Sequence, residues 1–67
     1  MAKIKLNGKL TRINREQSVL NLLNILKINK KKIAVELNGK IIQRTAYKKS
    51  ILKNNDSLEI VHFIGGG

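Results

Sequence analysis

The C-terminal end carries the groups best suited to chemistry, because the last three residues are Gly65, Gly66 and Gly67. A terminal carboxylate can be activated by ATP only where it reaches the nucleotide site of another protein. Glycine has no Cβ, so a glycine segment can pass through a narrow channel and approach a ligand closely. Ordering that segment costs conformational entropy, which a docking enzyme must offset. The pattern predicts chemistry at the Gly67 carboxylate, although terminal glycines are also typical of a frayed end or a cloning remnant.

Other reactive side chains are scarce in the sequence. It has no cysteine, a single histidine at position 62 and four carboxylates. A disulfide framework and a cysteine metal site are therefore excluded, and we expect no metal site and no catalytic role for His62. A chain of 67 residues also has little room for a buried catalytic pocket.

The charge is strongly basic, with 14 Lys and Arg against four Asp and Glu and a net charge of +10. Such a balance suggests nucleic acid. However, the lysines are spread along the chain except for the run 30–32, and the aromatics that stack on bases are reduced to one Tyr and one Phe. We therefore favour a solvated basic face that meets acidic proteins, and we keep a basic nucleic-acid-binding module as an alternative.

Hydropathy predicts neither a membrane span nor a signal peptide. No apolar run approaches the roughly 18 residues that a transmembrane helix requires. The N-terminal residues begin a period-2 alternation instead of the apolar stretch of a secretory leader. We expect a protein without a membrane partner, located in the cytoplasm or, in an organelle-bearing source, in the plastid stroma.

Alternation of apolar and polar residues predicts several strands. A first hairpin turns at Asn7-Gly8, the dipeptide most typical of a type I′ turn. A strand over 33–37 turns at Asn38-Gly39 into an extended segment at 40–42, and strong β-formers predict a last strand over 58–64.

One main helix is predicted behind Ser18, whose side chain can cap it. Val19, Leu22, Leu23 and Leu26 follow at i, i+3, i+4 and i+7 spacing, and Leu20 and Ile25 widen the apolar stripe toward the sheet. Asn21 stands where a capping box has Glu or Gln, so the box is expected to be incomplete. A short helical turn is expected over 45–50, capped by Thr45. The expected fold is α+β, with the helix packed across a mixed four- to five-stranded sheet.

These elements and the terminal glycines together resemble the ubiquitin-like sulfur carriers and, more narrowly, the ThiS family of thiamine biosynthesis. The resemblance covers essentially the whole chain. Its matching segments are Ile4-Lys5-Leu6-Asn7-Gly8, Ser18-Val19-Leu20-Asn21-Leu22-Leu23, Ile33-Ala34-Val35-Glu36-Leu37-Asn38-Gly39-Lys40-Ile41-Ile42, Arg44, Asp56 and Glu59-Ile60-Val61-His62-Phe63-Ile64-Gly65-Gly66-Gly67. The chain departs from the family at Gln43 and Tyr47, where Pro and Trp are usual, and in its basic charge.

The resemblance implies a β-grasp domain over 1–64 and a flexible glycine tail at 65–67. It also implies that a ThiF-like adenylating enzyme uses ATP to activate the Gly67 carboxylate. A sulfur donor such as a cysteine desulfurase system would then yield a thiocarboxylate for a ThiG-like thiazole synthase. On this view the protein binds no cofactor and is a carrier, not an enzyme.

Partner binding is expected at the tail and at the strand before it, namely at Val61, Phe63, Ile64, Gly65 and Gly66. Val61 and Phe63 alternate with the core-facing positions of that strand, so we expect them to form an exposed apolar patch. A molybdopterin-synthase-type sulfur carrier and a ubiquitin-like protein modifier remain alternatives, because both use the same kind of terminus.

Overall fold

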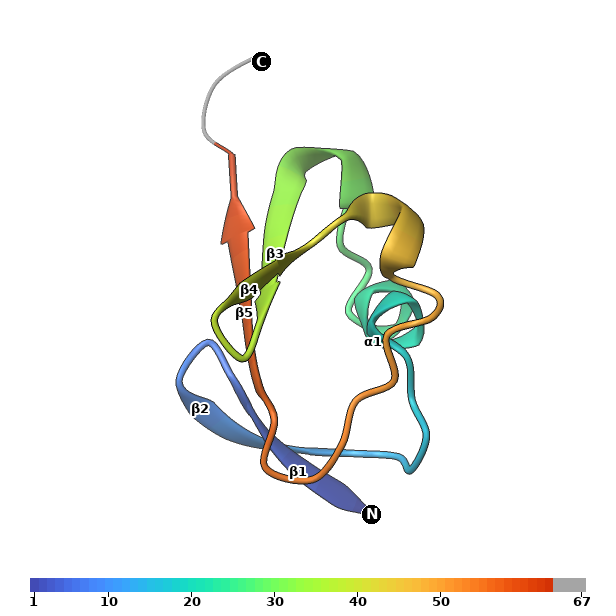
Figure 1. The fold of residues 1–67 in the computed structure, drawn as a ribbon, viewed down its shortest axis with the longest axis vertical. Coiled ribbons are helices and arrows are strands. Elements are labelled where there is room, and N and C mark those ends of the chain that lie inside the picture. Colours follow the sequence, from blue (N-terminus) through green and yellow to red (C-terminus); the bar gives the residue numbers. More distant parts are fainter. Residues whose placement is uncertain (64–67) are drawn as a thin grey trace.

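The computed structural model of the chain describes residues 1–63 (Figure 1). Within them, the strands are β1 (Ala2–Leu6), β2 (Lys9–Ile13), β3 (Ile33–Leu37), β4 (Lys40–Ile42) and β5 (Ser57–His62). The α-helix is α1 (Val19–Ile25), and two 3-10 helices are η1 (Lys30–Lys32) and η2 (Arg44–Ala46). The expected boundary between a domain at 1–64 and a tail at 65–67 lies outside the described residues and stays a prediction.

The strands form one mixed sheet in the order β2-β1-β5-β3-β4. The last strand therefore lies in the middle, parallel to β1 and antiparallel to β3. The α1 helix lies on one side of the sheet, as Figure 1 shows. The α+β class and the five-stranded mixed sheet with one main helix confirm the sequence-based prediction.

The core lies between α1 and the sheet. Its fully buried side chains come from α1 and from the alternate positions of β1, β3 and β5: Ile4, Val19, Leu23, Val35 and Leu58. Tyr47, which follows η2, is also buried, with 3% of its surface exposed. Burial of apolar side chains from each of these elements holds the sheet and the helix together.

Both Asn-Gly turns have the predicted geometry. Asn7 and Gly8 have φ of 50° and 79°, and Asn38 and Gly39 have φ of 53° and 84°. Two consecutive positive φ angles define the type I′ turn, which matches the twist of the two strands that it joins. The turns therefore fix the register of the β1–β2 and β3–β4 hairpins.

Two predictions about α1 are wrong. Ile25 does not widen the buried stripe and Leu26 does not complete it, because 60% and 42% of their surfaces are exposed, while Val19, Leu22 and Leu23 are buried. The capping box is complete, because the Asn21 side chain accepts a hydrogen bond from the Ser18 backbone N–H at 3.4 Å while Ser18 Oγ accepts from the Asn21 N–H at 3.0 Å. An amide oxygen on the shorter Asn side chain serves here in place of Glu or Gln.

The predicted cap of the second helical turn is also wrong. The turn begins at Arg44, one residue before Thr45, and its N-cap residue Gln43 makes no side-chain capping bond. Within residues 1–63, no helix is both long and apolar enough to cross a bilayer.

Candidate functional site

The candidate site is the end of β5, because this strand leads to the predicted reactive terminus. β5 pairs with β3 along five residue pairs, from Leu58 opposite Leu37 to His62 opposite Ile33. The next residue, Phe63, donates its backbone N–H to the carbonyl of Lys32 at 2.9 Å. The sheet therefore holds the backbone as far as Phe63. Ile64, Gly65, Gly66 and Gly67, all expected to serve in binding or chemistry, lie outside the described residues.

Asparagines from both hairpin turns hold β5 from its two sides. Asn7 Oδ1 accepts a hydrogen bond from the Ile60 N–H at 2.7 Å, and the Asn7 N–H donates to the Leu58 carbonyl at 2.9 Å. On the other side, Asn38 Oδ1 accepts from the Ser57 N–H at 2.9 Å, and Asn38 Nδ2 donates to Asp56 Oδ1 at 2.9 Å. Sequence reasoning assigned both asparagines to turns only and missed this second role.

Val61 and Phe63 lie exposed at the end of the central strand. Of their surfaces, 53% and 58% are exposed, whereas Leu58 and Ile60, at alternate positions, are buried. Val61 stands opposite half-buried Ala34 of β3, so these apolar groups share the sheet face that points away from the core. The predicted exposure of Val61 and Phe63 is confirmed, and their role in binding a partner stays a prediction.

A pair of glutamates borders this apolar patch. Glu59 of β5 lies directly opposite Glu36 of β3, on the same outer face as Val61. Like charges opposite each other in a sheet are destabilising. No ion pair relieves them among residues 1–63, although the chain carries 14 cationic side chains.

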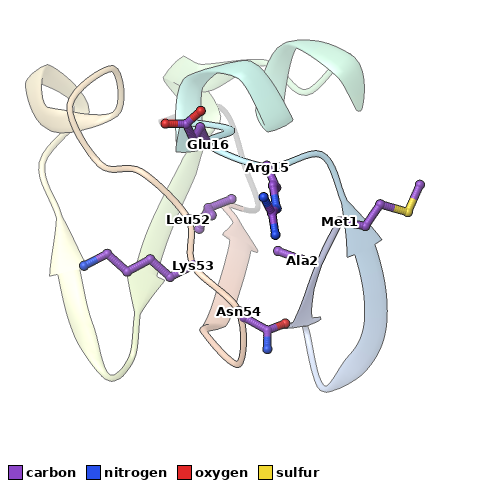
Figure 2. A pocket seen from close by; sticks show the side chains of 7 residues that line it. All are labelled: Met1, Ala2, Arg15, Glu16, Leu52, Lys53 and Asn54. Atoms are coloured by element: carbon purple, nitrogen blue, oxygen red, sulfur yellow. The ribbon is translucent and has the colours of Figure 1, made fainter.

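The described residues hold no catalytic constellation. No group of three His, Cys, Asp or Glu side chains within 1–63 is placed to hold a metal ion. A pocket of about 610 Å³ lies near the N-terminus and is lined by Met1, Ala2, Arg15, Glu16, Leu52, Lys53 and Asn54 (Figure 2). Figure 1 places the N-terminus and the end of β5 at opposite ends of the molecule. This pocket contains one carboxylate and no nucleophile–base pair, so it does not suggest an active site.

A helix across one face of a mixed sheet, with a central last strand that ends in exposed apolar residues, defines the class of ubiquitin-like β-grasp proteins. The crystal structure of the thiamine biosynthesis protein ThiS from Geobacter metallireducens has this fold. It superposes with a TM-score of 0.84 at 32% identity and covers 97% of this chain and 99% of that one. The predicted ubiquitin-like β-grasp fold is thereby confirmed.

Sequence comparison identifies the family within this class. The ThiS family profile matches residues 4–67. The sulfur carrier protein ThiS of Bacillus subtilis is 35% identical over 65 residues, covering 96% of this chain and 98% of that protein. The chain belongs to the ThiS family of sulfur carriers of thiamine biosynthesis.

A longer relative matches over one part of its length only. The thiazole synthase of Paramagnetospirillum magneticum is 37% identical over 65 residues, which are 97% of this chain but 20% of that protein. The chain thus spans about a fifth of the thiazole synthase that it matches.

Proposed function

We propose that this carrier holds sulfur on its C-terminal Gly67 and delivers it to a thiazole synthase. An E1-like adenylating enzyme of the ThiF type would catalyse attack of the Gly67 carboxylate on the α-phosphate of ATP, with pyrophosphate leaving. A persulfide sulfur, supplied by a cysteine desulfurase system, then attacks the acyl carbon and AMP leaves. Cleavage of the remaining S–S bond by a thiol yields the thiocarboxylate and a disulfide. The chain itself binds no cofactor in this scheme, since ATP is used by the partner.

The observation that supports this proposal best is the fixed exit of β5. Paired with β3 as far as the hydrogen bond between Phe63 and Lys32, the strand has a defined direction up to four residues before Gly67. A partner that recognises Val61 and Phe63 therefore meets Phe63, the last residue that the structure describes before the tail, in a defined position. Such pre-organisation lowers the entropic cost of guiding a short glycine segment into a nucleotide site.

The thiazole synthase is proposed as the acceptor because a protein of that name contains a segment similar to this chain. A carrier joined to its acceptor enzyme raises the effective concentration of the two reacting groups. We expect this chain to deliver sulfur to the same kind of enzyme. Both enzymes and ATP would share its compartment, the cytoplasm or the plastid stroma.

Intact-protein mass spectrometry tests the proposal directly. The chain is incubated with ATP, a sulfur source and a ThiF-like enzyme that is active on its own carrier. We expect a mass gain equal to replacement of one oxygen by sulfur, localised to Gly67 by fragmentation. A variant that lacks Gly67 should fold normally and remain unmodified. Sulfur transfer by that variant, or no modification of the full chain, would overturn the proposal.

A further inference from the structure

A second pocket lies on the helical side of the sheet and plays no part in the proposed chemistry. Its volume is about 290 Å³. Half-buried Leu20 at the start of α1 and buried Tyr47 form its apolar base. Four cationic residues surround this base: Lys30, Lys31, Arg44 and Lys48. Thr45 completes the lining, and we call these seven residues the basic pocket.

The segments around the basic pocket are held by hydrogen bonds. The Leu20 N–H donates to the Tyr47 carbonyl at 3.1 Å, which joins α1 to the chain after η2. The Tyr47 N–H donates to the Arg44 carbonyl at 3.2 Å. Across the pocket, Asn29 Oδ1 accepts from the Lys31 N–H at 3.0 Å and so caps η1. The cations therefore project from backbone segments that are already ordered.

Among residues 1–63, no negatively charged side chain lines the basic pocket. The four Asp and Glu residues all lie elsewhere in this part of the chain. Lys30 Nζ donates to Asn24 Oδ1 at 2.7 Å, a neutral partner that leaves its charge uncompensated. Four cations gathered around an apolar base repel one another, and an anionic ligand would relieve that repulsion.

The basic pocket lies at the end of the molecule where β5 leads toward the C-terminus. Lys30 and Lys31 immediately precede Lys32, whose carbonyl holds the Phe63 N–H. Figure 1 shows the green segment around residues 30–32 and the yellow segment around 44–48 at the same end as the tip of β5. A protein bound at the end of β5 can therefore reach the basic pocket as well.

We propose that the basic pocket docks an acidic segment of a partner protein, with one large apolar side chain on the base and Asp or Glu carboxylates on the four cations. The proposal rests on the proposed function for one point only, namely that this partner is the enzyme that activates Gly67. The basic charge would then serve in partner selection, since charge complementarity directs encounter and specificity.

The size and lining of the pocket favour a protein segment over nucleic acid. Its volume lies just below the range of about 300–1,000 Å³ of small-molecule sites, and suits one side chain. Single-stranded nucleic acid is bound on stacking aromatic faces, but the aromatic residue here, Tyr47, is 3% exposed. The cations at the rim remain available for carboxylates.

NMR titration of the ¹⁵N-labelled chain tests the proposal with the acidic peptide Ac-EDEFEDE-amide as the probe. We compare Lys31→Glu/Lys48→Glu in the basic pocket with Lys3→Glu/Lys5→Glu on β1. All four lysines are exposed, and both double variants lose the same net charge. Spectra of the free variants verify the fold. The peptide Ac-EDEAEDE-amide lacks the apolar anchor, and an oligothymidylate of eight nucleotides represents nucleic acid.

We expect amide shifts confined to residues 30–31 and 44–48, and a dissociation constant at least tenfold weaker for the pocket variant than for the β1 variant. The peptide Ac-EDEAEDE-amide, which lacks the apolar anchor, should bind the unsubstituted chain more weakly than Ac-EDEFEDE-amide does. Amide shifts that spread over Lys3, Lys5 and Arg12 would overturn the proposal. An equal loss of peptide affinity in both double variants would also overturn it, because net charge alone would then explain the binding. Tighter binding of the oligothymidylate at the same residues would overturn it in favour of nucleic acid. Formation of the Gly67 thiocarboxylate is measured separately, so failure here leaves the proposed function intact.

Discussion

The side chain of Asn7 takes the place of a strand residue beside Ile60. Regular pairing of β1 with β5 covers only two residue pairs, Lys5 with Ser57 and Leu6 with Leu58. Beyond them the chain turns at Asn7, and its Oδ1 accepts the Ile60 N–H at 2.7 Å. One side chain thus extends the support of the central strand toward the tail, while the same residue adopts the positive φ of 50° that the hairpin needs.

Replacing Asn7 should separate these two roles. Asn7→Gly keeps the positive φ but leaves the Ile60 N–H without its acceptor, so we expect a loss of about 1 kcal/mol in unfolding free energy. Asn7→Asp retains an oxygen acceptor and should lose less. Urea denaturation measures both, and hydrogen exchange should show faster exchange of the Ile60 amide in Asn7→Gly. Equal protection of that amide in the two variants would show that the bond contributes nothing.

Lys27 carries backbone strain at the end of α1. Its N–H donates to the Asn24 carbonyl, the Ile28 N–H donates to the Leu23 carbonyl, and Lys27 has a φ of 57°. This is the Schellman motif, in which glycine is usual at the left-handed position. We expect Lys27→Gly to raise the unfolding free energy by about 0.5–1 kcal/mol, because the left-handed conformation is costly for residues with a Cβ. Thermal denaturation measures the gain. The control Lys27→Ala keeps the strain, and an equal gain there would contradict the explanation.

The glutamate pair beside the apolar patch predicts a stabilising charge change. Glu36→Lys would place opposite charges across β3 and β5 at the Glu36–Glu59 pair. We expect a gain of about 0.2–1 kcal/mol in unfolding free energy, which shrinks in 1 M NaCl. Glu36→Gln removes the repulsion without adding attraction and should gain less. If Glu36→Lys gains no more unfolding free energy than Glu36→Gln at low salt, attraction between the opposite charges does not contribute to the stability.

The sequence predicts the elements of the fold but not the side-chain bonds that join distant ones. Period-2 alternation and the two Asn-Gly dipeptides suffice for β3 and both hairpins, since turn geometry depends on neighbouring residues. The resemblance to sulfur carriers supplies the topology. Exposure of Ile25 was not predicted: it is the last residue of α1, and 60% of its surface is exposed. A periodic pattern shows which residues share a helix face and does not show where the covering sheet ends.

The candidate site, like the fold, could be predicted from the sequence only in part. Exposure of Val61 and Phe63 follows from strand alternation, whereas the roles of Asn7 and Asn38 along β5 depend on residues more than 15 positions away. The basic pocket likewise gathers side chains from η1, η2 and α1, which are separate in the sequence. The run 30–32 alone gives no sign of Arg44 and Lys48 nearby.

Phe63 offers the sharpest test of the patch at the end of β5. Phe63→Asp replaces an exposed apolar ring with a charge, which should weaken docking of the adenylating enzyme by tenfold or more, because apolar anchors dominate binding energy. Leu10→Asp is the matched control, since Leu10 is 67% exposed on β2, away from the end of β5. Surface plasmon resonance measures both affinities, and circular dichroism verifies the fold. Equal affinity of the two variants would remove Phe63 from the docking surface and leave recognition to the tail itself.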